Sequence, residues 1–506
     1  MTIPASDRHT MKPKASFDGG DLDCGNGLLL LIRKNLDALE VGHLLEIKST
    51  DISVEEDLPA WCRLTKNELV SWTKVGQQRS YLVCKGALRT EGGSHTRVEV
   101  KERSPAKAEA TKTELPPDRP VPLIEPLSVM GIGSWPRPRW MLRVMHEFLE
   151  GKLSEDEFQE SADDAVRLVI EQQLRVGADV ITDGEQRRDN YSSFVGARLE
   201  NVQLVPLIDL LPLVDHPEEF QRQLDSLDIP SSVVRHPAVF GKLSRKATLA
   251  AHESNFLRRI TSSPIKVSLP GPYLLTRTMY LDCFKERAYA SREALADDIV
   301  QILREEITDL LQSGASLVQL DEPILTEVVF GAPQHQRTFM CGALSERGET
   351  GEELQFATEL LNRVTDGFPR ERLAMHVCRG NWSPDESVAL TGGYELLLPV
   401  FQKIKFGTLF LEMCTPRAGE MEILKELPNN VRIGVGVVNP KDTNVESIES
   451  VYDKAMRAAS LVGLDRVLLN PDCGFATFAD NPVTDAETAC RKLAVIVEAA
   501  RRLKHG

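Results

Sequence analysis

The feature of this chain that most constrains its fold is a pattern that repeats along its C-terminal part. A short run rich in Val, Ile or Leu is followed by a polar or Gly/Pro cluster and then by a helical stretch. The eight runs lie at residues 127–136, 178–187, 264–272, 315–323, 372–380, 407–416, 431–440 and 466–475. Strand and helix that alternate eight times indicate a (β/α)8 barrel, whose usual size of ~250 residues leaves room for insertions here. We therefore predict an α/β fold built around a (β/α)8 TIM barrel.

Residues 89–125 divide the chain into two predicted domains. They are charged, rich in Pro and poor in aromatics, so they bury too little apolar surface to offset the entropy of ordering, which predicts a linker. Before it, residues 14–88 contain a helical period over 28–39 and strand patterns at 44–48 and 79–85. We expect a small α/β sandwich domain there, and the barrel over residues 126–506.

The net charge and the hydropathy pattern restrict the partners. A formal charge of −15 argues against a nucleic-acid surface, which needs clustered Lys and Arg, and favours a small-molecule substrate. No stretch approaches the ~20 apolar residues of a membrane span, and the first residues lack the apolar core of a signal peptide. We predict a cytoplasmic protein without membrane contact, whose cysteines are thiols, metal ligands or catalytic groups and not disulfides.

Polar side chains gather at the ends of the predicted strands. In (β/α)8 barrels the carboxyl ends of the strands form the face that carries the chemistry. The residues at these ends are Ser134, Asp183, Glu185, Asp321, Glu322, His376, Cys378, Glu412, Asp472 and Cys473. We expect them to ring one mouth of the barrel.

Four of these residues form a candidate zinc site. His376 and Cys378 lie two apart on one strand, so both side chains project from the same face. Glu412 ends the next strand and Cys473 ends the last one. One nitrogen, one oxygen and two thiolates suit tetrahedral Zn2+. A His-x-Cys pair alone also fits a core histidine beside a buried cysteine, and Cys414 is an alternative ligand, but the placement of all four residues at the polar ends of predicted strands favours the metal.

Seven segments of the large domain carry a family resemblance. They are GIGSWPRP, DGEQRRDN, KVSLPGPY, QLDEP, MHVCRG, FLEMC and NPDCGF, in this order over residues 127–480. Together they resemble the catalytic barrel of cobalamin-independent methionine synthase and its short relatives, including epoxyalkane:coenzyme M transferase. The resemblance implies that His376, Cys378, Glu412 and Cys473 are the zinc ligands. It also implies that Ser134, Glu185 and Asp321 hold the thiol substrate, which is homocysteine in the long synthases.

The same resemblance implies a mechanism. The substrate sulfur enters the zinc sphere, Glu412 yields its place, and the thiolate attacks an electrophilic carbon, while Asp321 and Glu185 hold a cationic group of the substrate. Zinc suits this step because it deprotonates a thiol of ordinary pKa ~8.5. The long synthases have a second barrel that helps to bind folate, and this chain has no counterpart. The donor therefore stays open between a methylated corrinoid, a folate and an unrelated electrophile.

Residues 17–84 resemble the TusA-like sulfur-carrier fold. FDGGDLDCGNGLLLLIRK stands at that family's strand, cysteine and helix, and EEDLPAWCRLTKNEL matches its second signature. The resemblance implies that Cys24 carries sulfur, although the family's Cys-Pro-x-Pro is here Cys-Gly-Asn-Gly. A cysteine just before a helix has a lowered pKa, because the first-turn N–H groups favour the thiolate, and this suits persulfide transfer. The alternative is a domain kept for docking or dimer contact.

Three functions remain open, in this order. The first is a zinc-dependent transfer of a methyl or alkyl group to a homocysteine-like thiol. The second is a zinc-dependent desulfurase acting on a thiocarbonyl or thioether substrate, with sulfide passed to Cys24 or to a sulfur-relay protein. The third is a non-catalytic zinc scaffold, which the acids at the mouth argue against because a structural site needs only its ligands. Asp321, Glu185 and Cys24 are the predicted catalytic residues.

Overall fold

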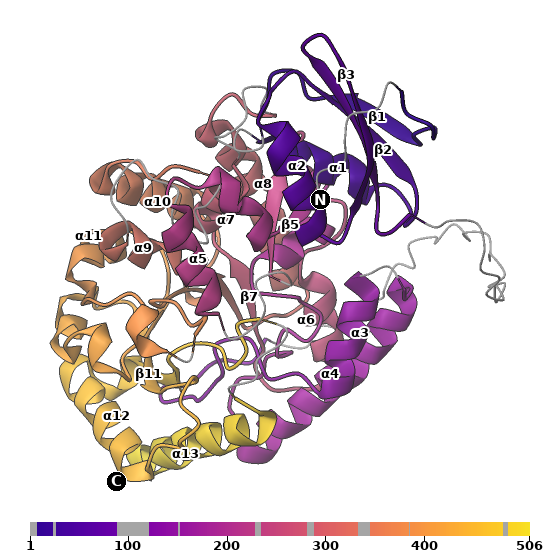
Figure 1. Cartoon of the computed structure of the whole chain (residues 1–506). Helices are drawn as coiled ribbons and strands as arrows, with labels where there is room; N and C mark the ends of the chain where they lie inside the picture. The colour runs from indigo at the N-terminus through magenta and orange to yellow at the C-terminus, as the bar shows by residue number, and fades with distance from the viewer. Residues whose placement is uncertain are drawn as a thin grey trace. The chain divides into compact units, whose positions relative to one another are not determined.

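The computed structural model divides the chain into two compact units, Met1–Arg119 and Pro120–Gly506. It describes residues 8–23, 27–88, 121–149, 152–227, 234–280, 288–331, 345–383, 385–478 and 484–505. Cys24 and most of the predicted linker at 89–125 therefore lie outside the described residues. Figure 1 labels the helices and strands of both units.

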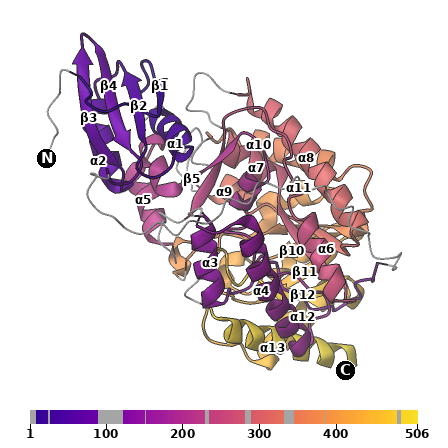
Figure 2. The same ribbon diagram turned by 90° about the vertical axis from the view of Figure 1, so that its right-hand side faces the viewer.

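The N-terminal unit is a four-stranded sheet with two helices (Figure 2). Its elements are β1 (Ala15–Asp18), α1 (Leu29–Asp37), β2 (Leu44–Ser49), α2 (Val54–Leu64), β3 (Glu68–Val75) and β4 (Gln78–Cys84). The strand order is β1-β2-β4-β3, with β1 and β2 parallel and the other pairs antiparallel. Side chains of both helices form one core with the sheet, including Ile32, Leu58 and Tyr81. The sequence pattern predicted α1, β2 and β4, the resemblance to the carrier fold implied a strand at β1, and α2 and β3 were not predicted.

Six parallel strands form the main sheet of the C-terminal unit. They are β7 (Lys266–Pro270), β8 (Leu317–Asp321), β9 (Leu373–Val377), β10 (Thr408–Leu411), β11 (Arg432–Val438) and β12 (Val467–Pro471). Each pairs with the next one along the chain. Each also falls within one of the runs predicted as strands.

The two remaining predicted strands close this sheet into a ring. Parallel bridges join Val129 to Leu469, Met130 to Val180, and Ile181 to Ile265. The amide of Met130 donates to the carbonyl of Leu469 at 3.1 Å, and the amide of Ile181 donates to the carbonyl of Pro264 at 2.9 Å. Both edges of the six-stranded sheet are thus connected through the first two runs, which gives the eight-membered parallel arrangement of a TIM-like barrel.

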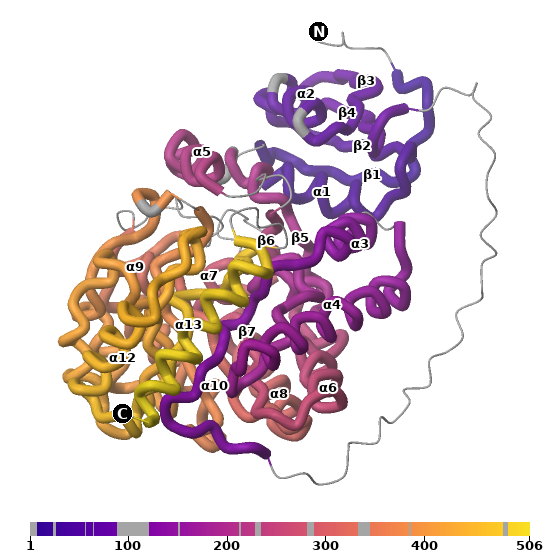
Figure 3. The backbone as a smooth tube through the Cα atoms, turned by 90° about the horizontal axis from the view of Figure 1, so that it is seen from below, coloured from indigo at the N-terminus to yellow at the C-terminus, as the bar shows by residue number. Residues whose placement is uncertain are grey.

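Helices surround this ring (Figure 1). They are α3 (Arg139–Leu149), α4 (Glu155–Val176), α6 (Ala251–Ile260), α7 (Pro272–Met279), α8 (Arg292–Gln312), α9 (Ile324–Phe330), α10 (Thr350–Thr365), α11 (Leu398–Phe401), α12 (Ile448–Val462) and α13 (Ala486–His505). The last helix, α13, packs beside α4 from the start of the unit, as the tube in Figure 3 shows. Among the described residues, no helix is long and apolar enough to cross a membrane.

Helix α4 shows how the local sequence sets these elements. It begins at a capping box in which Ser154 accepts a hydrogen bond from the amide of Glu157 and the Glu157 side chain accepts one from the amide of Ser154. It ends at Gly177, whose φ of 88° favours glycine. The predicted apolar face is buried and comprises Phe158, Ala162, Val166, Val169 and Ile170.

An insertion separates the second barrel segment from β7. It contains an antiparallel pair, β5 (Val202–Pro206) and β6 (Arg235–Val239), together with the 3-10 turn η3 (Leu207–Leu213) and helix α5 (Pro217–Asp225). The sequence did not predict these elements. They matter for function because residues of this insertion line the cavity described below.

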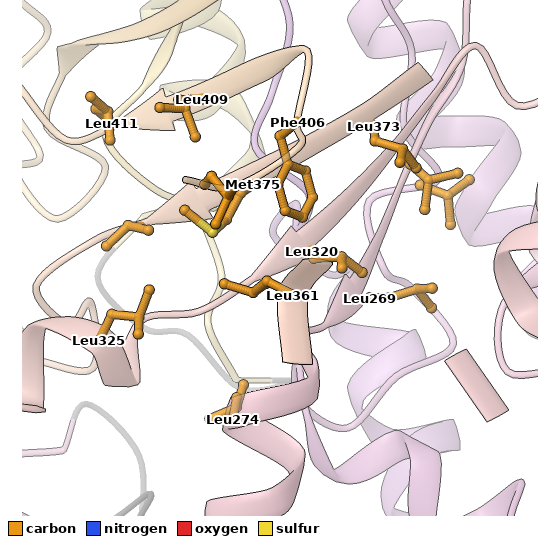
Figure 4. Packing of buried hydrophobic residues seen from close by; sticks show 14 of the residues in the cluster. Leu269, Leu274, Leu320, Leu325, Leu361, Leu373, Met375, Phe406, Leu409 and Leu411 are labelled. Carbon is orange, nitrogen blue, oxygen red and sulfur yellow. The ribbon is translucent and has the colours of Figure 1, made fainter. Parts of the chain in front are cut away.

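Alternation along the strands separates an outer core from the barrel interior. The outer layer packs strands against helices and includes Leu269, Leu320, Met375, Leu409, Leu274 and Leu361 (Figure 4). A second cluster fills the interior and comprises Met130, Ile132, Val180, Leu317, Ala374, Phe410 and Leu468. Because side chains alternate, Asp321 and His376 share the interior face with Leu317 and Ala374. This alternation directs the polar side chains at the strand ends into the barrel mouth.

Candidate metal centre

A cavity of about 100 Å³ lies where the barrel strands end. Six of the residues proposed from the sequence line it: Ser134, Glu185, Asp321, His376, Cys378 and Cys473. They come from five separate runs of the barrel, so the fold brings together side chains that are far apart in the chain. Of the other two, Glu412 lies beside the cavity lining and Cys24 lies outside the described residues.

Three of these side chains form a candidate metal site. One ligand atom each of His376, Cys378 and Cys473 lies within 4.8 Å of the other two, and the two sulfurs are 3.9 Å apart. Zinc sits about 2.0–2.3 Å from nitrogen and sulfur ligands, so tetrahedral neighbours are roughly 3.5 Å apart. A small contraction of the cluster therefore accommodates one ion.

The imidazole of His376 is oriented by Asp321. The Nδ1 atom lies 2.9 Å from Oδ1 of Asp321, and Nε2 lies 3.4 Å from the carbonyl oxygen of Asp472. A carboxylate accepts, so Nδ1 carries the hydrogen, and a bound metal would take the lone pair of Nε2 in place of the contact with the Asp472 carbonyl. Burial opposes the charged imidazole, but the Asp321 hydrogen bond and the nearby charges of Cys378 and Asp321 raise the pKa of His376.

The two sulfurs share a hydrogen bond in which Cys473 donates to Cys378. This bond, acting against burial, is the main reason that the pKa of Cys378 is lowered to about 7. The same bond and burial raise the pKa of Cys473 well above its ordinary value. Cys378 is therefore the sulfur that loses its proton first, and a bound cation would remove the second proton as well.

Glu412 stands next to the three-residue cluster and is held by other groups. Its Oε1 accepts from Nε of Arg417 at 2.6 Å, and its Oε2 accepts from the amide of Arg379 at 2.9 Å. The side chain is 1% exposed. The structure thus gathers His376, Cys378 and Cys473 and leaves Glu412 paired with Arg417.

Cys414, the alternative ligand, points to a different partner. Its sulfur lies 3.1 Å from Nζ of Lys454, and burial raises its pKa to about 12. It is absent from the cluster formed by the described residues. Asp472 also has a structural contact here, because its Oδ1 accepts from the amides of Met413 and Cys414, both at 2.9 Å.

Glu185 and Ser134 face the same cavity as the cluster. Ser268 donates to Oε1 of Glu185 at 2.6 Å, and Nη1 of Arg188 lies 3.7 Å from that oxygen. Burial raises the pKa of Glu185 despite these partners. Both acceptors need glycines nearby: a Cβ on Gly133 would lie 2.2 Å from Oε1 of Glu185, and one on Gly474 would lie 2.1 Å from Oγ of Ser134.

Four of the strand-end acids do not line the cavity, which corrects the expectation that all of them ring it: Asp183, Glu322, Glu412 and Asp472. Asp183 accepts from the amide of Glu185 at 2.9 Å. Glu322 accepts from the amides of Tyr273 and Leu274, at 2.8 and 2.9 Å, at the start of α7. Burial raises the pKa of Glu322 to about 8. These acids satisfy backbone N–H groups, which a strand-end pattern alone cannot distinguish from site residues.

The sequence missed part of the cavity wall. Side chains from the insertion and from two loops line it, among them Tyr191, Leu207, Val234, His236, Trp382 and Phe478. His236 is 4% exposed and its Nε2 lies 2.6 Å from the carbonyl oxygen of Thr278. Burial lowers its pKa to about 4, so it is neutral near pH 7. No periodic signal marks these residues, because they follow turns and a short hairpin.

Comparisons with known proteins agree with this architecture. Residues 127–502 match the family model of the cobalamin-independent synthase catalytic domain. The chain is 24% identical over 371 residues to the methionine synthase of Saccharolobus solfataricus, covering 73% of this chain and 92% of that protein. The Sulfolobus acidocaldarius methionine synthase is 25% identical over 344 residues, covering 68% and 84% of the two chains.

Two solved structures share the fold. One is a B12-independent methionine synthase from a Shewanella species, with a TM-score of 0.57, 24% identity, and coverage of 76% of this chain and 98% of that one. The other is a B12-independent methionine synthase described as putative, from Listeria monocytogenes, with a TM-score of 0.54, 18% identity, and coverage of 76% and 99%. Both alignments leave about a quarter of this chain unmatched.

Proposed function

The chain belongs to the family of cobalamin-independent synthase catalytic domains, and on that premise we propose that it transfers a methyl group to a zinc-activated, homocysteine-like thiol. The observation that carries this proposal is that the cluster of His376, Cys378 and Cys473 opens onto the cavity that Glu185 also lines. A structural zinc site is closed by its ligands, whereas a catalytic site keeps a position that substrate can reach.

The donor set fits zinc. Two sulfurs and an imidazole nitrogen are donors that zinc prefers, and the Asp321 hydrogen bond already orients the nitrogen. His376, Cys378 and Cys473 would hold the ion, with Glu412 or the substrate sulfur as the fourth ligand. When bound, zinc would supply the positive charge that keeps a thiol as a reactive thiolate at neutral pH.

Glu412 is the ligand that makes room for the substrate in this proposal. Arg417 forms a charge-assisted hydrogen bond of 2.6 Å with its carboxylate, and the amide of Arg379 binds the second oxygen. These two donors give the carboxylate a stable position away from the cluster. Arg417 would therefore hold Glu412 when a substrate thiol binds to the metal in its place.

The acids in the cavity are assigned to the ammonium group of an amino-acid thiol. Glu185 and Asp321 both line the cavity, and burial already raises the pKa of Glu185. A substrate ammonium would favour the ionised carboxylate and repay part of its desolvation. We assign the hydroxyl of Ser134 to the substrate carboxylate, because Ser134 lies on the same cavity.

The methyl donor in this proposal is a methylated corrinoid or a reduced folate. The family model and the curated relatives described above concern methionine synthases and give no support to the alternative of a desulfurase, so methyl transfer is the one reaction put forward. The cavity argues against the scaffold, because the cluster faces open space together with Glu185 and Ser134.

For the N-terminal unit we propose the TusA-like sulfur-carrier fold. The support is the element order strand, helix, strand, helix, strand, strand, with sheet order β1-β2-β4-β3, and the sequence signatures noted above. Cys24 precedes α1 in the sequence and is the residue assigned to sulfur carriage. A Cys24→Ser variant tests this role: loss of persulfide labelling on the full chain is expected, and retained labelling would contradict it.

The experiment for the main proposal measures metal, product and sulfide together. Purified protein is analysed for zinc and then incubated with homocysteine and either methylcobalamin or methyltetrahydrofolate. We expect about one zinc per chain, methionine with one donor, and no sulfide. Sulfide without a methylated product, or methionine formation by a zinc-free Cys378→Ser/Cys473→Ser variant, would overturn the proposal.

A further inference from the structure

A lysine is buried inside the barrel, close to the candidate metal centre. Lys266 is the first residue of β7 and is 1% exposed. Its ammonium lies 2.7 Å from Oε1 of Gln319 and 4.2 Å from the centre of the Phe410 ring. A buried ammonium costs free energy unless it is well paired, so a lysine among apolar interior residues needs a reason beyond packing.

The ammonium begins a chain of hydrogen bonds that ends on a proposed zinc ligand. Lys266 donates to Oε1 of Gln319 at 2.7 Å, and Nε2 of Gln319 donates to Oδ1 of Asp321 at 2.7 Å. Oδ1 of Asp321 lies 2.9 Å from Nδ1 of His376. Three consecutive bonds thus connect the buried lysine to the imidazole, and all four side chains are buried.

The direction of these hydrogen bonds is fixed at both ends, by Lys266 and by Asp321. An ammonium only donates, so the oxygen of the Gln319 amide must face it, and the NH2 group must then face Asp321. Asp321 receives this bond and the bond from Nδ1–H of His376, which leaves the Nε2 lone pair for a metal. Without a donor at position 266, the Gln319 side chain loses one of the two hydrogen bonds that hold it in place, and its buried amide oxygen loses its partner.

The same strand also supports the other acid of the cavity. Ser268, two residues along β7 and therefore on the same face, donates to Glu185 at 2.6 Å. Lys266 reaches Asp321 through Gln319, whereas Ser268 contacts Glu185 directly. Lys266 and Ser268 of β7 thus serve both acids, and these two buried polar side chains have a defined use.

We propose that Lys266 is a positioning residue of the metal centre, which anchors the hydrogen-bond network of Gln319, Asp321 and His376 and so holds the imidazole with Nε2 towards the ion. This inference rests on the proposed zinc centre. Partners of metal-bound histidines typically contribute 10–100-fold in metal affinity. Lys266 acts one bond further from the histidine than Gln319 does, so we expect its loss to weaken zinc binding by about tenfold.

The test compares two buried lysines in the full-length protein. Lys266→Met removes the first donor of the chain. Lys492→Met is the matched control. Lys492 lies in α13, is also fully buried and pairs with Glu446 at 2.8 Å, but it takes no part in the hydrogen-bond network of Lys266. Both variants are expected to melt at lower temperature as apoproteins. Zinc affinity, measured by chelator competition, is expected to fall about tenfold in Lys266→Met and to stay within twofold of wild type in Lys492→Met.

Gln319→Leu provides a second route to the same answer if Lys266→Met does not fold. It removes both hydrogen bonds of Gln319 while leaving Asp321 and His376 in place. Zinc affinity is therefore expected to fall, and the visible spectrum of the cobalt-substituted protein is expected to shift. Unchanged zinc affinity and cobalt spectrum in Lys266→Met or Gln319→Leu would overturn the inference, as would equal losses in Lys492→Met. A wild-type chain that binds no zinc would instead refute the metal centre itself.

Discussion

The cavity has two walls that are built in different ways. One wall consists of strand-end residues, Asp321, His376, Cys378 and Cys473, whose polar atoms contact one another through directed hydrogen bonds. The other comes from the insertion and includes Leu207, Val234 and the neutral His236. This difference shows that the pairing of the barrel strands sets the positions of the reactive side chains, while the inserted segment closes the cavity around them.

The largest effect is expected from substitution of the two cysteines in the wall formed by the strand-end residues. Cys378→Ser and Cys473→Ser each replace a thiolate ligand by a hydroxyl that stays protonated, so zinc is expected to be lost and kcat/KM for methyl transfer to fall on the order of 10³-fold or more. Folding of the apoprotein should be largely retained, since the cluster fills a small part of the core. Zinc analysis and circular dichroism check both statements, and a zinc-replete Cys473→Ser protein would contradict the ligand assignment.

The next effect separates the two roles assigned to Asp321. Asp321→Asn keeps an oxygen that can accept from Nδ1–H of His376 but loses the charge assigned to the substrate ammonium. Asp321→Ala loses both. We expect zinc affinity to fall about 10–100-fold in Asp321→Ala and only a few-fold in Asp321→Asn.

The thiol KM completes this comparison. It is expected to rise in both Asp321 variants if the carboxylate binds the ammonium. Steady-state kinetics at saturating zinc measures KM without the affinity effect. An unchanged KM in Asp321→Asn would leave Asp321 as a partner of His376 alone and would assign the ammonium to Glu185.

The strand-end wall is also the part that could be predicted from the sequence. All eight runs proposed as strands take their places in the closed ring, because strands buried on both faces leave a short, bounded apolar signal. Alternation then placed His376 and Cys378 on one face. These steps need only local pattern and one rule about parallel strands.

The remainder depends on contacts that no local pattern records. The bond of Glu412 with the amide of Arg379 and the capping of α7 by Glu322 are tertiary hydrogen bonds. The hydrogen bonds that lead from Lys266 through Gln319 and Asp321 to His376 join three strands. The insertion was missed because β6 contains Pro237 within five residues and alternates poorly. An acid at a strand end can therefore be placed near the barrel mouth from the sequence, but its hydrogen-bond partners determine whether its role is structural or functional.

Substitutions in the wall that the insertion forms are expected to change the stability of the protein and its pH dependence more than they change metal binding. His236 has a folded pKa of about 4, below the ordinary value of 6.5, because burial disfavours its charge. Below pH 6.5 this histidine is protonated in the unfolded protein but stays neutral in the folded one. The free energy of unfolding therefore decreases as the pH falls from 6.5 towards 4, by up to about 3 kcal/mol. His236→Gln keeps a donor for Thr278 and removes this titration.

Urea unfolding of the zinc-free protein at pH 7, 6 and 5 checks the prediction. The loss of stability on acidification is expected to be smaller in His236→Gln than in wild type, with zinc affinity within twofold. His252, whose pKa burial lowers to about 3, is common to both proteins, so its contribution cancels in the comparison. Identical pH profiles would show that His236 does not stay neutral in the folded state.

The smallest effect is expected at a cysteine that lies beside the strand-end wall but is not part of it. Cys414 is two residues from Glu412, yet its sulfur is 3.1 Å from Lys454, and burial raises its pKa to about 12. Cys414→Ser keeps an acceptor for Lys454, so zinc content and kcat/KM are expected to stay within about twofold of wild type. The variant is thus matched to Cys378→Ser in chemistry and differs from it in location alone. Loss of zinc in Cys414→Ser would mean that Cys414, and not Glu412, completes the metal site, since no other thiol among the described residues lies on that strand end.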